Sequence, residues 1–175
     1  GQLAESAAVA PQNIYKTVTC NLKKIKTNIT NRTIKFVEFD TTKNWISDFP
    51  IDNWCLIVIA DEKQMNYFDE IIRKSIDRNV GYICGVGKQA DLIHDMADEE
   101  IGFRDVDIDD HYLPEHVIMT VGDEDFENGI WFGLNLTFNS ETDIDEIVII
   151  DVTKKAFEKT TELIKKLESG YLPAD

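Results

Sequence analysis

Acidic residues stand where strands of a sheet would end in this 175-residue sequence. In a doubly wound sheet, ligands bind outside the carboxyl ends of the parallel strands, so residues that follow those strands meet at one edge. Carboxylate oxygens are the ligands that Mg²⁺ prefers, and a bound Mg²⁺ supports phosphoryl transfer or hydrolysis. A magnesium site at this edge would use Asp61, Asp123, Asp125 and Asp151.

A glycine-containing turn, Gly85-Val86-Gly87-Lys88, follows another apolar run. Such a turn can hold a phosphate at the N-terminus of the next helix, with Gly85, Gly87 and Lys88 as the binding residues. The sequence is not a P-loop, because four residues do not separate the glycines and neither Ser nor Thr follows the lysine. A tight connection between a strand and a helix is the alternative explanation of the same residues.

The charge of the chain is concentrated in one segment. The formal net charge is −15, and residues 91–145 contain seventeen acidic residues against a single basic one, Arg104. Such a segment repels nucleic acids and anionic membranes, and it attracts cations or a basic protein. The predicted partner-binding residues are Asp105, Asp107, Asp109 and Asp110. The alternative is that these acids only keep the surface soluble.

The alternating aspartates resemble the start of a calcium-binding loop, but the loop pattern is broken. Its sixth position is Asp110 instead of glycine, and its twelfth is His116 instead of glutamate. Calcium needs the sharp turn and the bidentate ligand that those two positions supply. We therefore expect an extended acidic segment. No cysteine or histidine spacing fits a zinc site, and no nucleophilic triad can be assembled from the sequence.

Hydrophobic periodicity predicts alternating strands and helices. Strands are predicted at 18–22, 34–39, 54–60, 80–86, 117–121 and 147–152. Helices are predicted from 61, with Asp61 as the N-cap, to 78, then at 90–102, 126–138 and 154–169, with a short one between Thr42 and Phe49. The segment 130–138 also alternates as a strand would. We favour a helix there, because parallel neighbouring strands require a crossover connection.

These elements predict an α/β fold. We expect one three-layer domain over residues 14–175, with a mostly parallel sheet of about five strands flanked by helices and an N-terminal strand pair that extends it. Residues 1–13 are expected to form a disordered tail. No apolar run approaches the length of a membrane span, and three widely spaced cysteines exclude a disulfide scaffold. A cytoplasmic protein is expected, with an exported mature form as the alternative.

The C-terminal part of the chain also resembles a known family. Met119-Thr120, Asp123-Glu124, Ile130-Trp131-Phe132 and the run from Ile147 to Val152 occur in an order similar to that of a family of small bacterial α/β domains of unknown function. The resemblance covers roughly the C-terminal hundred residues. Where a Trp and a His follow the Thr in that family, this chain has Val121 and Gly122. The resemblance implies the fold and carries over no activity.

Two functional hypotheses follow from the sequence. The first is a non-catalytic binding or accessory domain, without a cofactor, whose acidic surface at 91–145 contacts a basic protein. An immunity or inhibitor protein that blocks a cationic site would use such a surface, because opposite charges accelerate association. The alternative is a Mg²⁺-dependent phosphoryl-transfer or hydrolase enzyme that uses the carboxylates at the sheet edge. The sequence identifies neither the partner nor the oligomeric state.

Overall fold

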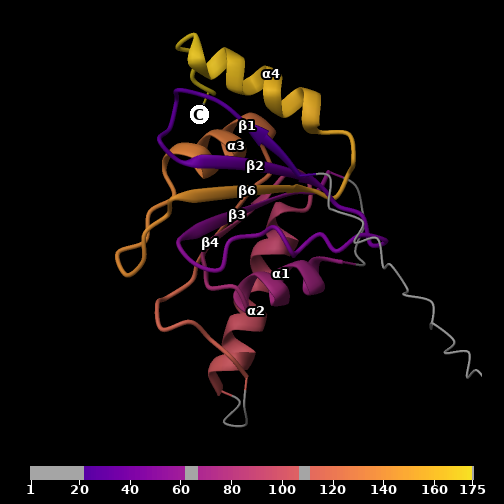
Figure 1. The fold of residues 1–175 in the computed structure, drawn as a ribbon, viewed down its shortest axis with the longest axis vertical. Coiled ribbons are helices and arrows are strands. Elements are labelled where there is room, and N and C mark those ends of the chain that lie inside the picture. Colours follow the sequence, from indigo (N-terminus) through magenta and orange to yellow (C-terminus); the bar gives the residue numbers. More distant parts are fainter. Residues whose placement is uncertain (1–21, 62–66, 107–110, 175) are drawn as a thin grey trace, which may run out of the picture.

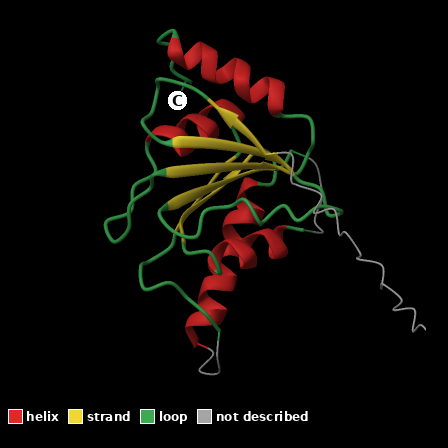
Figure 2. Cartoon of the chain, viewed as in Figure 1, coloured by secondary structure: helices red, strands yellow, loops and turns green. Residues whose placement is uncertain are grey.

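The computed structural model describes residues 22–61, 67–106 and 111–174, and within them one sheet is covered by helices on both faces (Figures 1 and 2). The six strands are β1 (Leu22–Ile25), β2 (Thr33–Glu38), β3 (Trp54–Ile59), β4 (Val80–Val86), β5 (Met119–Asp123) and β6 (Glu146–Asp151). The four helices of the described part are α1 (Phe68–Ile76), α2 (Ala90–Val106), α3 (Phe126–Asn135) and α4 (Phe157–Glu168). The predicted α/β class is confirmed.

The strand order is β1-β2-β6-β3-β4-β5. Five neighbouring strands are parallel, and β1 joins β2 as an antiparallel pair at the edge, which confirms the predicted N-terminal pair. From β3 the chain moves outward through β4 to β5, and α3 then returns it to β6, between β2 and β3. The direction of travel therefore reverses between β6 and β3, the kind of position where ligands bind in doubly wound sheets.

Each face of the sheet has its own core. α1 and α2 pack on one face, and α3 and α4 pack on the other (Figure 1). Along β3, Leu56 and Val58 belong to the first core and Ile57 to the second, since successive side chains point to opposite faces. Every residue of β3 and β4 is buried. Covering on both faces explains why these two strands are continuous apolar runs in the sequence.

The segment near residue 130, whose hydrophobic pattern fits both a strand and a helix, is helical. Phe126–Asn135 forms α3, which crosses from β5 to β6 as the parallel topology requires. Gly133 allows the helix to approach β3 closely. A Cβ at that position would overlap the Cδ1 of the fully buried Ile57 and lie 2.9 Å from its Cγ1.

Several predicted helix boundaries are wrong. α1 begins at Phe68 with Tyr67 at its N-cap, so Asp61 does not cap it. α2 continues through Gly102 to Val106, and the segment from Thr42 to Phe49 forms turns instead of a helix.

β5 begins two residues later than predicted because Val117 is held by side chains. Its backbone N–H donates to Oε2 of Glu141 over 2.7 Å, and its carbonyl oxygen accepts from Nδ2 of Asn139 over 2.6 Å. The predicted tail at 1–13 and the predicted strand residues 18–21 lie outside the described residues. None of the described helices is long and apolar enough to cross a membrane.

Candidate functional site

The carboxyl ends of four parallel strands lie level with one another, as the site hypotheses require. Ile59 at the end of β3 pairs with Asp151 of β6 on one side and with Val86 of β4 on the other, and Val86 pairs with Asp123 of β5. Neighbouring strands are about 4.8 Å apart, so three steps separate the backbones of Asp151 and Asp123 by roughly 14 Å. These two carboxylates share an edge but not a site.

Asp151 is enclosed in the connection between β6 and α4. The residue is fully buried, and its Oδ1 accepts hydrogen bonds from the backbone N–H of Thr153 over 2.9 Å and from the hydroxyl of Thr153 over 2.6 Å. Its Oδ2 accepts from the backbone N–H of Ala156 over 2.8 Å. These bonds hold the turn that leads into α4, so the carboxylate has a structural role in this conformation.

Asp123 and Asp125 stabilise the start of α3. Asp125 is the N-cap, and its Oδ1 accepts from the backbone N–H of Asn128 over 2.7 Å. Asp123 accepts from the backbone N–H of Asp125 with Oδ1 and from Nδ2 of Asn128 with Oδ2. A capping carboxylate satisfies N–H groups that the first turn of a helix leaves without partners.

Asp61 lies beside the glycine turn, where a Cβ on Gly87 would overlap its Oδ1. Within the described residues, no group of three or more His, Cys, Asp or Glu side chains is arranged to hold a metal ion. The structure therefore brings Asp61, Asp123, Asp125 and Asp151 to one edge without gathering them. The magnesium site remains a prediction that this arrangement does not support.

The glycine turn uses its backbone N–H groups within the fold. Gly87 donates to the carbonyl of Asp123, Gln89 to that of Ala60, and Ala90 to that of Gly87 itself. Gly87 has a φ of 98°, which glycine adopts without strain. At Gly85 a Cβ would lie 2.6 Å from the carbonyl oxygen of Ala90, so this glycine lets α2 approach β4. Of the residues predicted to bind phosphate, Gly85, Gly87 and Lys88, Gly87 thus has its N–H engaged within the fold, as do Gln89 and Ala90 directly after the turn.

The acidic segment surrounds the end of the sheet where β5 is the edge strand. Its elements are α2, which packs on one side of β5, and α3, which packs on the other. Of the predicted partner-binding residues, Asp105 lies exposed near the end of α2, whereas Asp107, Asp109 and Asp110 fall outside the described residues.

Arg104, the one basic residue of this segment, is directed inward. Its side chain is 7% exposed, and it forms ion pairs with Asp77 over 2.6 Å and with Glu100 over 2.7 Å. Burial alone would lower the pKa of Arg104, but the hydrogen bonds to Asp77 and Glu100 outweigh it and raise the pKa above its ordinary value. A further hydrogen bond of 2.9 Å to the carbonyl of Tyr112 ties the following segment to α2.

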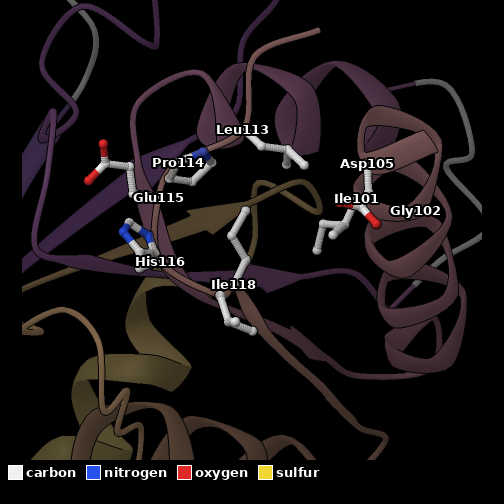
Figure 3. A pocket seen from close by; sticks show the side chains of 9 residues that line it. Ile101, Gly102, Asp105, Leu113, Pro114, Glu115, His116 and Ile118 are labelled. Carbon is white, nitrogen blue, oxygen red and sulfur yellow. The ribbon is translucent and has the colours of Figure 1, made fainter. Parts of the chain in front are cut away.

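A pocket of about 300 Å³ lies between the last turns of α2 and the segment that leads into β5 (Figure 3). Its apolar wall comes from Ile101, Leu113 and Ile118, and Asp105 and Glu115 stand at opposite ends of it (Figure 3). Sequence reasoning did not find this pocket. The available signal was Gly102, a glycine inside a helix at a position that also lines the pocket.

Comparison with known proteins gives a family match and assigns no activity. The model of a family described as a domain of unknown function (DUF7684) matches residues 33–169. The match begins at the first residue of β2 and ends just beyond α4, so it includes the five parallel strands and the acidic segment. This result confirms the resemblance noted from the sequence. No curated protein and no solved structure matches the chain.

Proposed function

Starting from the membership of this chain in the family of domains of unknown function DUF7684, we propose that it is a non-catalytic binding domain whose acidic surface contacts a basic protein. This acidic surface comprises the exposed carboxylates of residues 91–145. The observation that carries the proposal is the placement of charge: in the described part of 91–145 the single cation, Arg104, is buried in ion pairs, while most of the carboxylates face solvent.

The exposed carboxylates lie on elements that meet at the β5 end of the sheet. They include Asp91, Asp95, Asp98, Glu99, Asp105, Glu115, Glu124 and Asp125. Charges of one sign on neighbouring elements produce a field that extends beyond the surface and accelerates association with an oppositely charged partner. The same field opposes contact with nucleic-acid phosphates.

The acidic surface also carries apolar side chains that a partner would cover. Phe103 and Val106 on α2 are 52% and 73% exposed, and Val117 before β5 and Met119 at its start are 58% and 41% exposed. Protein interfaces combine a buried apolar centre with a polar rim, because apolar burial supplies affinity and charge supplies orientation. The combination favours a protein partner over a small cation.

An immunity or inhibitor protein fits this description. Such a protein covers a cationic site on its target, and it needs fast association more than catalytic groups. The described carboxylates at the sheet edge already serve the fold, since Asp151 closes a turn and Asp125 caps a helix. Within the part of the chain that the structure describes, other carboxylates of the acidic surface, among them Asp95, Glu99 and Asp105, are exposed and their side chains hold no turn or helix end.

The proposal is tested by charge variants matched in number. One variant neutralises four exposed carboxylates of the acidic surface, Asp95→Asn, Glu99→Gln, Asp105→Asn and Glu115→Gln. The control neutralises four exposed carboxylates elsewhere, Asp48→Asn, Glu158→Gln, Glu162→Gln and Glu168→Gln. Each immobilised chain is used to retain proteins from the native host, and the retained protein is then purified and its Kd measured between low and high salt.

We expect the wild type and the control to retain the same basic protein, with a Kd that rises with salt. We expect the acidic-surface variant to lose it. A partner that binds all three chains equally, a Kd independent of salt, or no protein that distinguishes wild type from the acidic-surface variant would contradict the proposal.

A further inference from the structure

We propose that the pocket between α2 and residues 113–118 binds one arginine side chain of the basic partner, with the guanidinium beside Asp105. The inference rests on the proposed function and specifies how the partner is held. The pocket volume of about 300 Å³ lies at the lower limit of small-molecule sites, so the pocket suits a single side chain better than a whole ligand.

Gly102, which lines the pocket, is the first feature that indicates an occupant there. A glycine inside a helix is about 1 kcal/mol less favourable than alanine, so its presence calls for an explanation. Other helix and strand glycines of this chain have one, since a Cβ at Gly85, Gly122 or Gly133 would collide with a neighbouring element. At Gly102 a Cβ would meet no atom of the described structure within 4 Å, and its φ is not positive. No described residue uses the open space that this glycine leaves.

The wall of the pocket suits the stem of a long cationic side chain. Ile101, Leu113 and Ile118 supply apolar surface between the two carboxylates (Figure 3). Arginine places three methylene groups on apolar surface and keeps its charged end near polar groups. A purely apolar occupant would leave the acidic ends of the pocket without a counter-charge.

The position of Asp105 identifies the end where the cation lies. Asp105 is in the last turn of the 17-residue helix α2, where the helix dipole is negative. A carboxylate and a helix C-terminus together attract a cation. The cation already present in that turn, Arg104, does not serve this purpose because Asp77 and Glu100 hold it. Glu115, at the opposite end, adds negative charge at longer range.

The pocket is formed before any partner arrives. Nη1 of Arg104 holds the carbonyl of Tyr112 at 2.9 Å, and Nε2 of His116 donates to the carbonyl of Val80 over 3.0 Å. Glu141 fixes the backbone N–H of Val117. Three anchors along the segment therefore set its position against α2. Binding to a formed pocket avoids the entropy cost of ordering a loop.

Arginine suits the pocket better than lysine. The guanidinium is planar and weakly hydrated, and it can pair with a carboxylate through two parallel hydrogen bonds while its faces contact apolar groups. The lysine ammonium is compact and strongly hydrated, so it loses more on leaving water. This difference makes the assignment testable with small probes.

The test uses the full ¹⁵N-labelled chain and three blocked tripeptides, acetyl-Gly-Arg-Gly-amide and the same peptide with lysine or with citrulline, the neutral counterpart of arginine. Backbone amide shifts are followed during titration. Asp105→Asn and Glu115→Gln remove one charge each. Gly102→Leu places a side chain at the pocket and keeps every charge, and Asp48→Asn serves as the distant control.

We expect saturable shifts at Gly102 and Ile118 with the arginine peptide, and much smaller ones with the lysine and citrulline peptides. Loss of Asp105 is expected to weaken binding about fivefold, more than loss of Glu115, since a partly exposed ion pair contributes about 1 kcal/mol. Gly102→Leu should abolish the shifts, and Asp48→Asn should leave them unchanged.

Shifts spread over the whole acidic surface, equal binding of lysine, or arginine binding that survives Gly102→Leu would overturn the inference. If Gly102→Leu does not fold, as judged by circular dichroism, the comparison of Asp105→Asn with Asp48→Asn decides alone. These outcomes are separate from those of the proposed function. A basic partner that binds in a salt-dependent way but tolerates Gly102→Leu would retain the function and remove the pocket from it.

Discussion

The same substitution should stabilise the chain at one helix glycine and fail to do so at another. Gly102→Ala adds a methyl group where the described structure has nothing within 4 Å, so only helix propensity acts. We expect this variant to unfold with a free energy about 1 kcal/mol higher than wild type. Gly133→Ala gains the same propensity, but its new methyl group overlaps the side chain of Ile57, which is 0% exposed in the centre of the sheet.

Both variants gain the same helix propensity, so this gain cancels from the difference between their free energies of unfolding. Forcing an extra methyl group into a close-packed core costs about 1–3 kcal/mol, so Gly133→Ala should be less stable than Gly102→Ala by that amount. Urea unfolding followed by circular dichroism measures both free energies. For a chain of this size each kcal/mol also shifts the Tm by about 2–4 °C.

A Gly133→Ala variant as stable as Gly102→Ala would refute the close approach of α3 to β3. A Gly102→Ala variant less stable than wild type would refute the conclusion that the described fold does not need this glycine, and Gly102 would then no longer indicate an occupied pocket.

Two further outcomes follow from the described contacts. Asp151→Ala should lower the free energy of unfolding by about 2–4 kcal/mol in urea denaturation, because the N–H groups of Thr153 and Ala156 lose their acceptor. Asp125→Ala, which removes an exposed N-cap, should lower it by about 1 kcal/mol. Equal losses in the two variants would contradict the structural role of Asp151. Burial and the neighbouring Cys55 thiol, 4.0 Å away between sulfur atoms, raise the pKa of Cys84, and both cysteines are buried. In a Cys20→Ser chain neither remaining cysteine should therefore be alkylated by iodoacetamide at pH 8 until urea is added, as mass spectrometry would show. Rapid alkylation of the native chain would contradict their burial.

The sequence predicts the sheet because its central strands are covered on both faces. Trp54–Ile59 and Val80–Val86 are apolar along their whole length, which only a buried strand tolerates. The choice of a helix for α3 depended on topology instead of periodicity. Its residues alternate as in a strand, yet a crossover between parallel strands leaves no other solution.

Boundaries were predicted poorly where a distant side chain decides them. Glu141 and Asn139 hold Val117 from more than twenty residues away, and no local pattern contains that information. Gly102 suggested a helix end, since a glycine with positive φ commonly follows the last turn. Here Arg104, beyond the glycine, continues the helix by pairing with Glu100 one turn earlier and with Asp77 at the end of α1.

The four carboxylates proposed as metal ligands lie at the predicted edge of the sheet, but topology alone overstated how close they are to one another. Residues at the ends of parallel strands share an edge, whereas a metal requires them within one or two strand widths. Asp151 and Asp123 are three strands apart, and β3 and β4 lie between them. Strand order is a long-range property, so the separation was not accessible from spacing along the sequence.

Solubility and binding make different demands on the position of the carboxylates in the acidic surface, so charge variants can distinguish the two roles. If the carboxylates served solubility alone, their position would be irrelevant, and four neutralised on α2 and the segment before β5 would have the same effect as four neutralised elsewhere. Concentrating them raises their mutual repulsion, which destabilises the folded chain. Arg104 does not relieve the repulsion among the exposed acids, because it is buried and paired with Asp77 and Glu100. An external cation that approaches the β5 end of the sheet would relieve this repulsion, and binding there would stabilise the native state by an amount that rises with the logarithm of the partner concentration divided by its Kd.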